Sequence, residues 1–141
     1  MTEISFYTFA DNKLDVARKL AAKAYSQGKR VMIYAPEPEV ADAIDRLLWT
    51  TPALGFLPHC RDSDTVSAET PVLIGINAAA LAQADVMINL HHDWPPAFAR
   101  FERLLEIVGQ DKSDREQGRV RYRFYQERGY AITPIDLRKA A

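Results

Sequence analysis

The first half of the chain alternates between short apolar runs and segments whose apolar residues recur every three or four positions. Residues 3–9 and 30–35 are runs of β-branched and aromatic residues, which are typical of strands. Residues 14–25 and 40–48 carry apolar stripes at helical spacing and are predicted to be amphipathic helices. We expect the second helix to end near Trp49, because a proline follows soon after and disfavours α conformation before it.

The second half continues the same alternation. Residues 71–76 and 86–90 are predicted to be buried strands, and residues 130–137 a last strand. A helix is predicted from residue 114 to residue 128. Another is predicted from Pro95-Pro96 to Gly109, because five apolar residues there fall on one helical face: Phe98, Phe101, Leu104, Leu105 and Val108.

This alternation indicates the fold class. Strands that alternate with helices predict an α/β domain with right-handed crossovers. Strands that are apolar on consecutive residues are typical of a parallel sheet with both faces covered. The sequence therefore predicts a Rossmann-like three-layer domain with a mostly parallel central sheet. At 141 residues we expect a single domain over residues 1–141.

Composition excludes several classes of protein. Hydrophobic residues make up 48% and charged residues 26%, which is typical of a globular protein rather than a disordered one. A net charge of −1 argues against a protein that coats nucleic acid by bulk charge. A single cysteine, the lack of a signal-peptide pattern and the lack of a long apolar run favour a cytoplasmic protein without a membrane role.

Two kinds of catalytic or cofactor site receive little support. The turn Phe9-Ala10-Asp11-Asn12-Lys13 has no glycine that would let a pyrophosphate approach the backbone, so no nucleotide cofactor is expected. His59 and Cys60 are neighbours on an extended chain and point to opposite sides, which disfavours a nucleophile with its base.

A possible metal site remains as the alternative hypothesis. His91, His92 and Asp93, with or without Cys60, offer up to four ligands, but at no specific metal-binding spacing. They follow a predicted parallel strand, and α/β proteins often bind ligands at such strand ends. The favoured interpretation is a polar loop without metal, and the alternative is a small metal-dependent enzyme that uses this cluster.

The predicted helix at residues 114–128 carries a basic, aromatic surface. At about 100° per residue, one side of the helix gathers four side chains: Arg115, Arg119, Tyr122 and Arg123. Val120 and Phe124 fall on the opposite side and are expected to face the core. Arginine binds carboxylates and phosphates, and tyrosine adds an apolar wall with a polar edge.

Such a surface suits an acidic peptide with an apolar last residue and a free carboxylate, or a short stretch of nucleic acid. Residues 119–130 carry +3, residues 131–141 carry +1 and the whole chain −1, which leaves −5 for residues 1–118 and makes nucleic acid the weakest hypothesis. A solvated helix with pairs such as Arg123 and Glu127 is the third interpretation.

A second apolar segment covers residues 48–59, which are rich in Trp, Phe, Leu and Pro. Its composition suits a segment folded into the core and an exposed patch that contacts another protein equally well.

With these residues in view, the sequence resembles the chi subunit family of bacterial DNA polymerase III over nearly its whole length. No single motif is diagnostic, but the order and spacing of several segments match: Ile4-Ser5-Phe6-Tyr7, Gly28-Lys29-Arg30-Val31, Leu47-Leu48-Trp49, Phe56-Leu57-Pro58-His59, Pro71-Val72-Leu73-Ile74, Asp85-Val86-Met87-Ile88-Asn89-Leu90 and Arg121-Tyr122-Arg123. The resemblance implies a Rossmann-like fold without nucleotide chemistry and a non-catalytic subunit of the holoenzyme, with no cofactor and no metal.

The resemblance also implies two protein partners. One is the psi subunit, which forms a heterodimer with chi and tethers it to the clamp loader. The other is the acidic C-terminal tail of single-stranded-DNA-binding protein, so that any contact with DNA is indirect. The implied tail-binding residues are Arg115, Arg119, Tyr122 and Arg123, and the implied psi-binding residues are Trp49, Phe56, Pro58 and His59.

Two departures from the family pattern stand out. Arginines occupy positions where better-known chi sequences have lysines, which keeps the charge. Gly118 interrupts the predicted helix just before Arg119, and an interior glycine costs about 1 kcal/mol relative to alanine.

Overall fold

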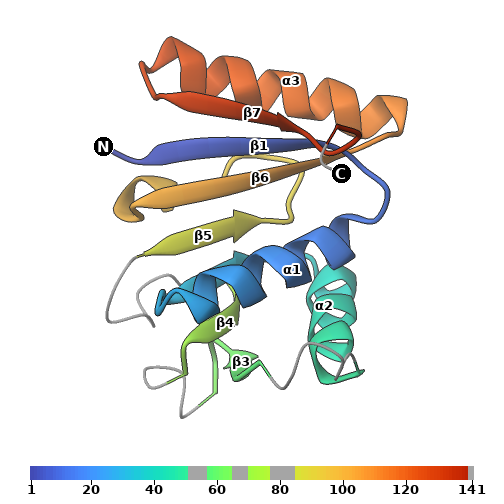
Figure 1. Cartoon of the computed structure of the whole chain (residues 1–141), viewed down its shortest axis with the longest axis vertical. Helices are drawn as coiled ribbons and strands as arrows, with labels where there is room; N and C mark the ends of the chain where they lie inside the picture. Colours follow the sequence, from blue (N-terminus) through green and yellow to red (C-terminus); the bar gives the residue numbers. More distant parts are fainter. Residues whose placement is uncertain (51–56, 65–69, 77–84, 140–141) are drawn as a thin grey trace.

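The structure is a computed structural model that describes residues 1–50, 57–64, 70–76 and 85–139. These residues form a seven-stranded sheet in the order β3-β4-β2-β5-β6-β1-β7, and every pairing is parallel (Figure 1). The strands are β1 Glu3–Ala10, β2 Val31–Tyr34, β3 His59–Arg61, β4 Val72–Gly75, β5 Val86–Asn89, β6 Arg103–Gly109 and β7 Ile132–Asp136. The α/β fold with a parallel sheet is therefore confirmed.

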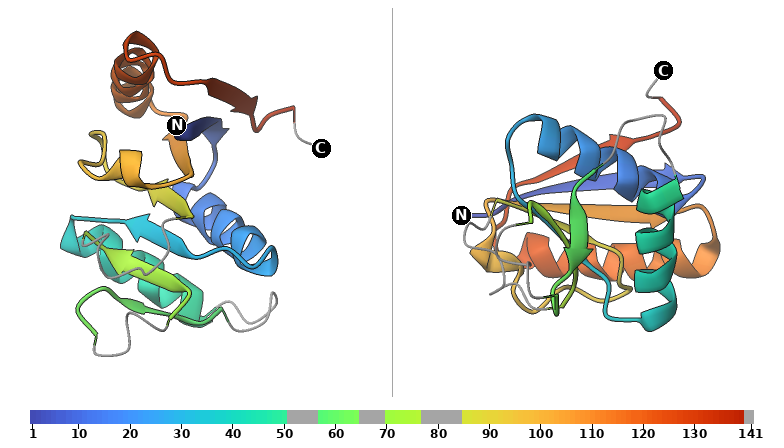
Figure 2. Two further views of the ribbon diagram at one scale, coloured as in Figure 1. Left: turned by 90° about the vertical axis from the view of Figure 1, so that its left-hand side faces the viewer. Right: turned by 90° about the horizontal axis from the view of Figure 1, so that it is seen from below.

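Three helices cover the two faces of this sheet in the described part of the chain. They are α1 Lys13–Ser26, α2 Pro38–Thr50 and α3 Lys112–Glu127. Helices α1 and α2 bury alanine and aliphatic side chains against one face, whereas α3 contributes Tyr125 to a second, aromatic core on the other. The right-hand view in Figure 2 shows α1 and α3 on opposite sides of β1 and β6. The three-layer arrangement follows from these two cores.

Both long helices at the ends of the sequence begin at side-chain caps. The Asn12 side chain accepts a hydrogen bond from the Asp15 amide, and the Asp111 side chain accepts one from the Asp114 amide. The predicted helix at residues 114–128 is confirmed as α3, which continues through Gly118 without a break. None of the helices in the described residues is both long and apolar enough to cross a membrane.

The prediction of one helix over residues 95–109 is wrong. Phe98–Arg100 form a single 3-10 turn, and Arg103–Gly109 form β6, which pairs with both β5 and β1. Leu104 and Val108 pack in the aromatic core and Leu105 and Ile107 in the aliphatic core. Apolar residues on both faces of a strand imitate helical spacing, which explains the error.

One edge strand of the sheet is short, and the other contains a proline. Strand β3 has three residues and lies where no strand was predicted. Strand β7 confirms the last predicted strand and carries the exposed Pro134 at its centre. The Leu137 amide donates to the Thr8 carbonyl, and the Ala131 carbonyl accepts from the Ile4 amide. The backbone N–H and C=O groups of odd-numbered residues in β7 therefore point toward β1. The backbone of the even-numbered Pro134 points away from β1, on the outer side of the sheet.

Candidate functional site

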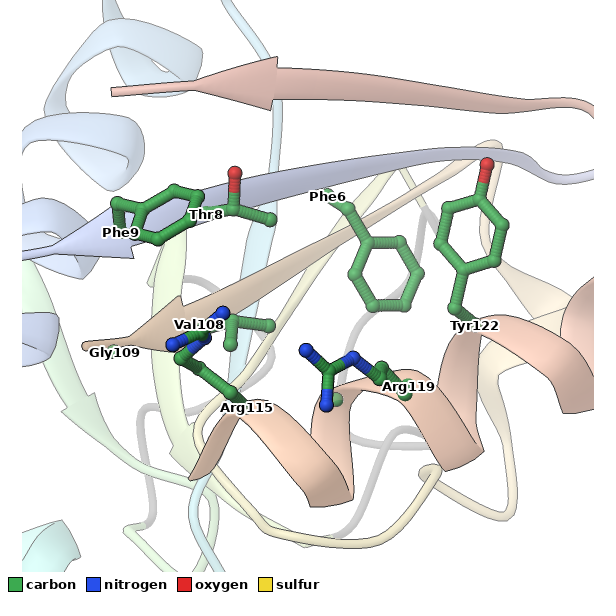
Figure 3. A pocket seen from close by; sticks show the side chains of 9 residues that line it. Phe6, Thr8, Phe9, Val108, Gly109, Arg115, Arg119 and Tyr122 are labelled. Atoms are coloured by element: carbon green, nitrogen blue, oxygen red, sulfur yellow. The ribbon is translucent and has the colours of Figure 1, made fainter. Parts of the chain in front are cut away.

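A pocket of about 240 Å³ lies between α3 and the carboxyl-terminal halves of β1 and β6 (Figure 3). Three of the four residues predicted to bind an acidic peptide line it, namely Arg115, Arg119 and Tyr122. The other lining residues are Phe6, Thr8, Phe9, Val108, Gly109 and Gly118. The structure thus combines an apolar hollow with two arginines.

The apolar part of the pocket is tightly built. The buried Phe6 ring packs against Tyr122, with ring centroids 5.1 Å apart, and against Tyr125 at 5.9 Å. Gly118 is buried against β6, and a Cβ atom there would lie 2.8 Å from Val108 Cγ2. The glycine therefore lets α3 lie close to the sheet at the pocket, which offsets its low helix propensity.

The two arginines lie on the solvent side of the pocket. Figure 3 shows Arg115 and Arg119 rising from α3 beside Phe6 and Val108. The Arg115 guanidinium lies 5.4 Å from the centroid of the Phe9 ring, and the Arg138 guanidinium lies 3.5 Å from it. Both are within the range of cation–π attraction. A free carboxylate that entered the pocket would meet an apolar surface next to guanidinium donors.

Phe9 is placed by an unusual backbone. Its φ is +59°, which is uncommon for a residue other than glycine, and the pairing of β1 with β6 shifts register between Tyr7 and Ala10. The sequence analysis did not find Phe6, Phe9 or Arg138 as site residues. Only the pairing of β1 with β6 and β7 brings them beside α3, and that pairing is not visible in a single sequence.

The remaining residues of α3 agree only in part with the helical-wheel prediction. Arg123 is exposed one turn beyond Arg119 and does not line the pocket. Val120, expected to face the core, is 56% exposed. Phe124 does pack inward and stacks on Trp94 at 3.7 Å between ring centroids.

Arg121 contributes to the local charge of +3 over residues 119–130, but its side chain is buried. Its Nε donates to Glu106 Oε1 at 2.9 Å, and its Nη1 donates to the His92 carbonyl at 2.7 Å. The Tyr125 hydroxyl donates to Glu106 Oε2 at 2.6 Å, and Asn89 Nδ2 donates to both carboxylate oxygens. Burial raises the pKa of the Glu106 carboxyl, while Arg121 acts in the opposite direction. We call the side chains of Asn89, Glu106, Arg121 and Tyr125 the buried network.

The histidine pair that the sequence analysis singled out lies beside a carboxylate from another segment. His91 Nδ1 is 2.7 Å and His92 Nδ1 3.6 Å from Glu37 Oε1. Asp93, a ligand only in the alternative hypothesis, accepts a hydrogen bond from the Trp94 amide at 2.9 Å and is not part of the group. Cys60 lies in β3 and is not part of it either.

The predicted psi-binding residues that the structure describes lie around β3, at the other end of the sheet. Trp49 is 61% exposed at the end of α2, and its ring lies 5.0 Å from the His59 ring. His59 is buried, with Nδ1 2.6 Å from the Leu57 carbonyl and Nε2 3.2 Å from Asp45 Oδ1. Pro58 is half-buried. Phe56 lies outside the described residues.

Comparison with known sequences identifies relatives. A family model described as DNA polymerase III chi subunit, HolC, matches residues 1–133. The chain is 32% identical to DNA polymerase III subunit chi of Pseudomonas aeruginosa over 136 residues, which cover 94% of each chain. The corresponding subunit of Haemophilus influenzae is 27% identical, over 91% of this chain and 92% of that one. That of Escherichia coli is 26% identical, over 81% and 78%.

Comparison with solved structures concerns the fold alone. The C-terminal domain of the DEAD-box protein Dbp5 superposes with a TM-score of 0.66 at 12% identity, over 99% of this chain and 92% of that one. The Pyrococcus furiosus Hef helicase domain gives a TM-score of 0.56 at 12% identity, over 82% of this chain and 28% of that one. Identity this low carries no statement about activity.

Proposed function

The chain belongs to the DNA polymerase III chi subunit family, and from this premise we propose that it is a non-catalytic adaptor that couples single-stranded-DNA-binding protein to the clamp loader. The adaptor has two contacts in this proposal. The α3 pocket binds the acidic C-terminal tail of single-stranded-DNA-binding protein, and the Trp49 surface binds the psi subunit as a heterodimer. DNA is reached only through these proteins.

The observation that carries the proposal is the pairing of an apolar hollow with two arginines. The apolar last residue of the tail packs on Phe6 and Tyr122, and its terminal carboxylate accepts hydrogen bonds from Arg115 and Arg119. Aspartates further back along the tail meet the outer cations, including Arg123. Each charge-assisted hydrogen bond contributes about 1.5–3 kcal/mol, so two or three with a buried side chain reach micromolar affinity after ordering costs.

The psi contact is supported by exposure and composition. An exposed tryptophan in contact with a buried histidine is typical of an interface centre, where aromatic residues supply most of the binding free energy. Trp49, Pro58 and His59 lie near one another at the β3 end, whereas Phe56 stays a psi contact predicted from the sequence alone. Interface rather than core is thus the proposed role of this segment.

The experiment is a calorimetric titration of the purified chain with a synthetic acidic peptide that ends in an apolar residue. We expect saturable binding that weakens at high salt, since the arginines are exposed. Two control peptides, one amidated at its C-terminus and one without the apolar last residue, should each bind at least about 10-fold more weakly, because each lacks one of the two contacts.

A matched pair of variants locates the contact. Arg119→Ala should weaken binding of the intact peptide, whereas Arg46→Ala, which removes an exposed arginine on α2, should not. If the intact peptide fails to bind, or if both variants bind it like the unaltered chain, the pocket assignment is wrong.

A further inference from the structure

We propose that Glu37, His91 and His92 form a binding site for one divalent transition-metal ion of the zinc type. The three residues are brought together at the carboxyl ends of two neighbouring strands, β2 and β5. Each offers one ligand atom, and the three atoms lie within 4.8 Å of one another. The inference goes beyond the adaptor function and departs from the expectation of no metal.

The distances are close to those that a zinc ion requires. Ligand bonds of about 2.0–2.2 Å in tetrahedral geometry place neighbouring ligand atoms about 3.4 Å apart. The distance from His92 Nδ1 to Glu37 Oε1 is 3.6 Å, and the distance from His91 Nδ1 to the same oxygen is 2.7 Å. The His91 contact is a hydrogen bond here. A shift of less than 1 Å in one side chain would widen the gap between the two atoms enough for an ion to take the place of the shared proton.

The backbone that carries the histidines is held from below by the buried network. The His91 amide donates to Asn89 Oδ1 at 2.9 Å, and the His92 carbonyl accepts from Arg121 Nη1 at 2.7 Å. Asn89 Nδ2 donates to the Asp93 carbonyl at 3.0 Å. Consecutive side chains on an extended chain diverge, but these two imidazole rings lie 4.1 Å apart between centroids. The loop is therefore fixed in a form that points both rings toward Glu37.

The donor set selects the class of ion. Two imidazole nitrogens and one carboxylate oxygen suit Zn²⁺, Co²⁺ and Ni²⁺, whereas Mg²⁺ and Ca²⁺ prefer oxygen ligands throughout. The His92 side chain is 58% exposed and that of Glu37 45% exposed, so the outer side of the group is open to solvent. Three protein ligands with an open fourth position leave room for water or for a carboxylate from a partner.

The test starts from metal-free protein titrated with Zn²⁺ by calorimetry and with Co²⁺ by visible absorption. We expect one ion per chain and a tetrahedral or five-coordinate Co²⁺ spectrum. Loss of a residue that only hydrogen-bonds a metal ligand costs about 10- to 100-fold in metal affinity. Glu37→Gln and His91→Asn alter a ligand itself, so each should lower the Zn²⁺ affinity by at least that much. Glu39→Gln, which alters an exposed carboxylate two residues away, is the matched control and should bind Zn²⁺ like the unaltered chain.

Three results would overturn the proposal: no saturable site of one ion per chain, equal affinity in Glu37→Gln and the unaltered chain, or a sulfur-to-cobalt charge-transfer band that puts Cys60 among the ligands. Circular dichroism of each variant excludes misfolding, and Glu37→Gln alters only a half-exposed side chain. Binding of the acidic peptide should be the same in all these variants, so the metal proposal and the adaptor proposal can fail separately.

Discussion

The two ends of the sheet present different kinds of surface. At the β1 and β7 end, α3 and two strands enclose an apolar pocket beside Arg115, Arg119 and Arg138. At the β3 end, Trp49 is exposed on α2, and Asp42 and Asp45 of the same helix pair with Arg61 of β3. A pocket with cations suits the end of an extended acidic chain, whereas an exposed aromatic side chain with mixed charges suits the surface of a folded protein.

The two ends of the sheet lie far apart, so each can be tested without disturbing the other. Four strands, β4, β2, β5 and β6, separate β3 from β1 in the sheet, and Figure 1 shows α3 and β3 at opposite ends of the long axis. Substitutions at one end should leave binding at the other unchanged, because sites this far apart with no shared contacts behave independently.

The largest expected effect comes from the buried network beneath the pocket end. Arg121→Ala leaves the Glu106 carboxylate without its cation, and breaking a buried ion pair costs about 3–5 kcal/mol. Urea denaturation should show this loss in the free energy of unfolding. Replacing Glu106 as well, in Arg121→Met with Glu106→Met, should recover part of it, and a loss below about 1 kcal/mol in Arg121→Ala would contradict the assigned role.

The next effect tests the independence of the two ends directly. Trp49→Ala should weaken psi binding by about 30-fold or more, which corresponds to the 2 kcal/mol typical of an interface centre. Affinity for the acidic peptide should not change. Tyr25→Ala, at a 40% exposed aromatic residue on α1, is the control for a general effect of aromatic removal. A parallel loss of both partners in Trp49→Ala would show that the ends are coupled.

A smaller effect should distinguish two arginines of α3 at the pocket end. Arg119 lines the pocket and Arg123 does not, so Arg119→Ala should lower peptide affinity by about 10-fold or more and Arg123→Ala by less than about 3-fold. Calorimetry at two salt concentrations measures both, and the Arg123 effect should vanish first as salt rises. Equal effects would place the terminal carboxylate further along α3.

The smallest effect concerns the acid end of the pH range. A hydrogen bond from the Arg138 side chain lowers the pKa of Asp136 from 3.8 to about 2. The contribution of this pair to stability is therefore present above the unfolded pKa near 4 and is lost as pH falls toward 2. A carboxyl titration by NMR should give the low pKa, and Arg138→Gln should return it toward 3.8. Asp136 titrating near 4 in the unaltered chain would contradict the pairing.

The helical periodicity of α3 predicted the positions of Arg115, Arg119 and Tyr122 beside one another, because a regular helix fixes which side chains share a face. It failed for Val120, and it did not predict that Arg121 is buried. A helical wheel assumes that charges face water, and here the phase of the helix is set by Gly118, Arg121 and Tyr125 packing on β6 and Glu106. The hydrogen bond between Arg121 and Glu106 joins residues fifteen positions apart, so it depends on tertiary structure and not on helical periodicity.

The same buried carboxylate adds to the largest error in the fold, the prediction of a helix where β6 lies. Strand β6 reads Leu104, Leu105, Glu106, Ile107 and Val108, and a charge in the middle of this run disguises a strand that is buried on both faces. Strand β1 supplied Phe6 and Phe9 to the pocket, and their role depends on strand order. Strand order is set by crossovers and packing and is not encoded in the periodicity of any one segment.

Pro134 at the centre of β7 affects whether two copies of the chain can pair through the edges of their sheets. Its nitrogen lies on the outer side of an edge strand and has no hydrogen to offer, so an approaching strand would lack a bond at that point. The opposite edge, β3, provides only three residues for pairing. A sheet protected in this way should resist edge-to-edge aggregation at high local concentration, because neither edge in the described part of the chain offers a long run of free backbone groups.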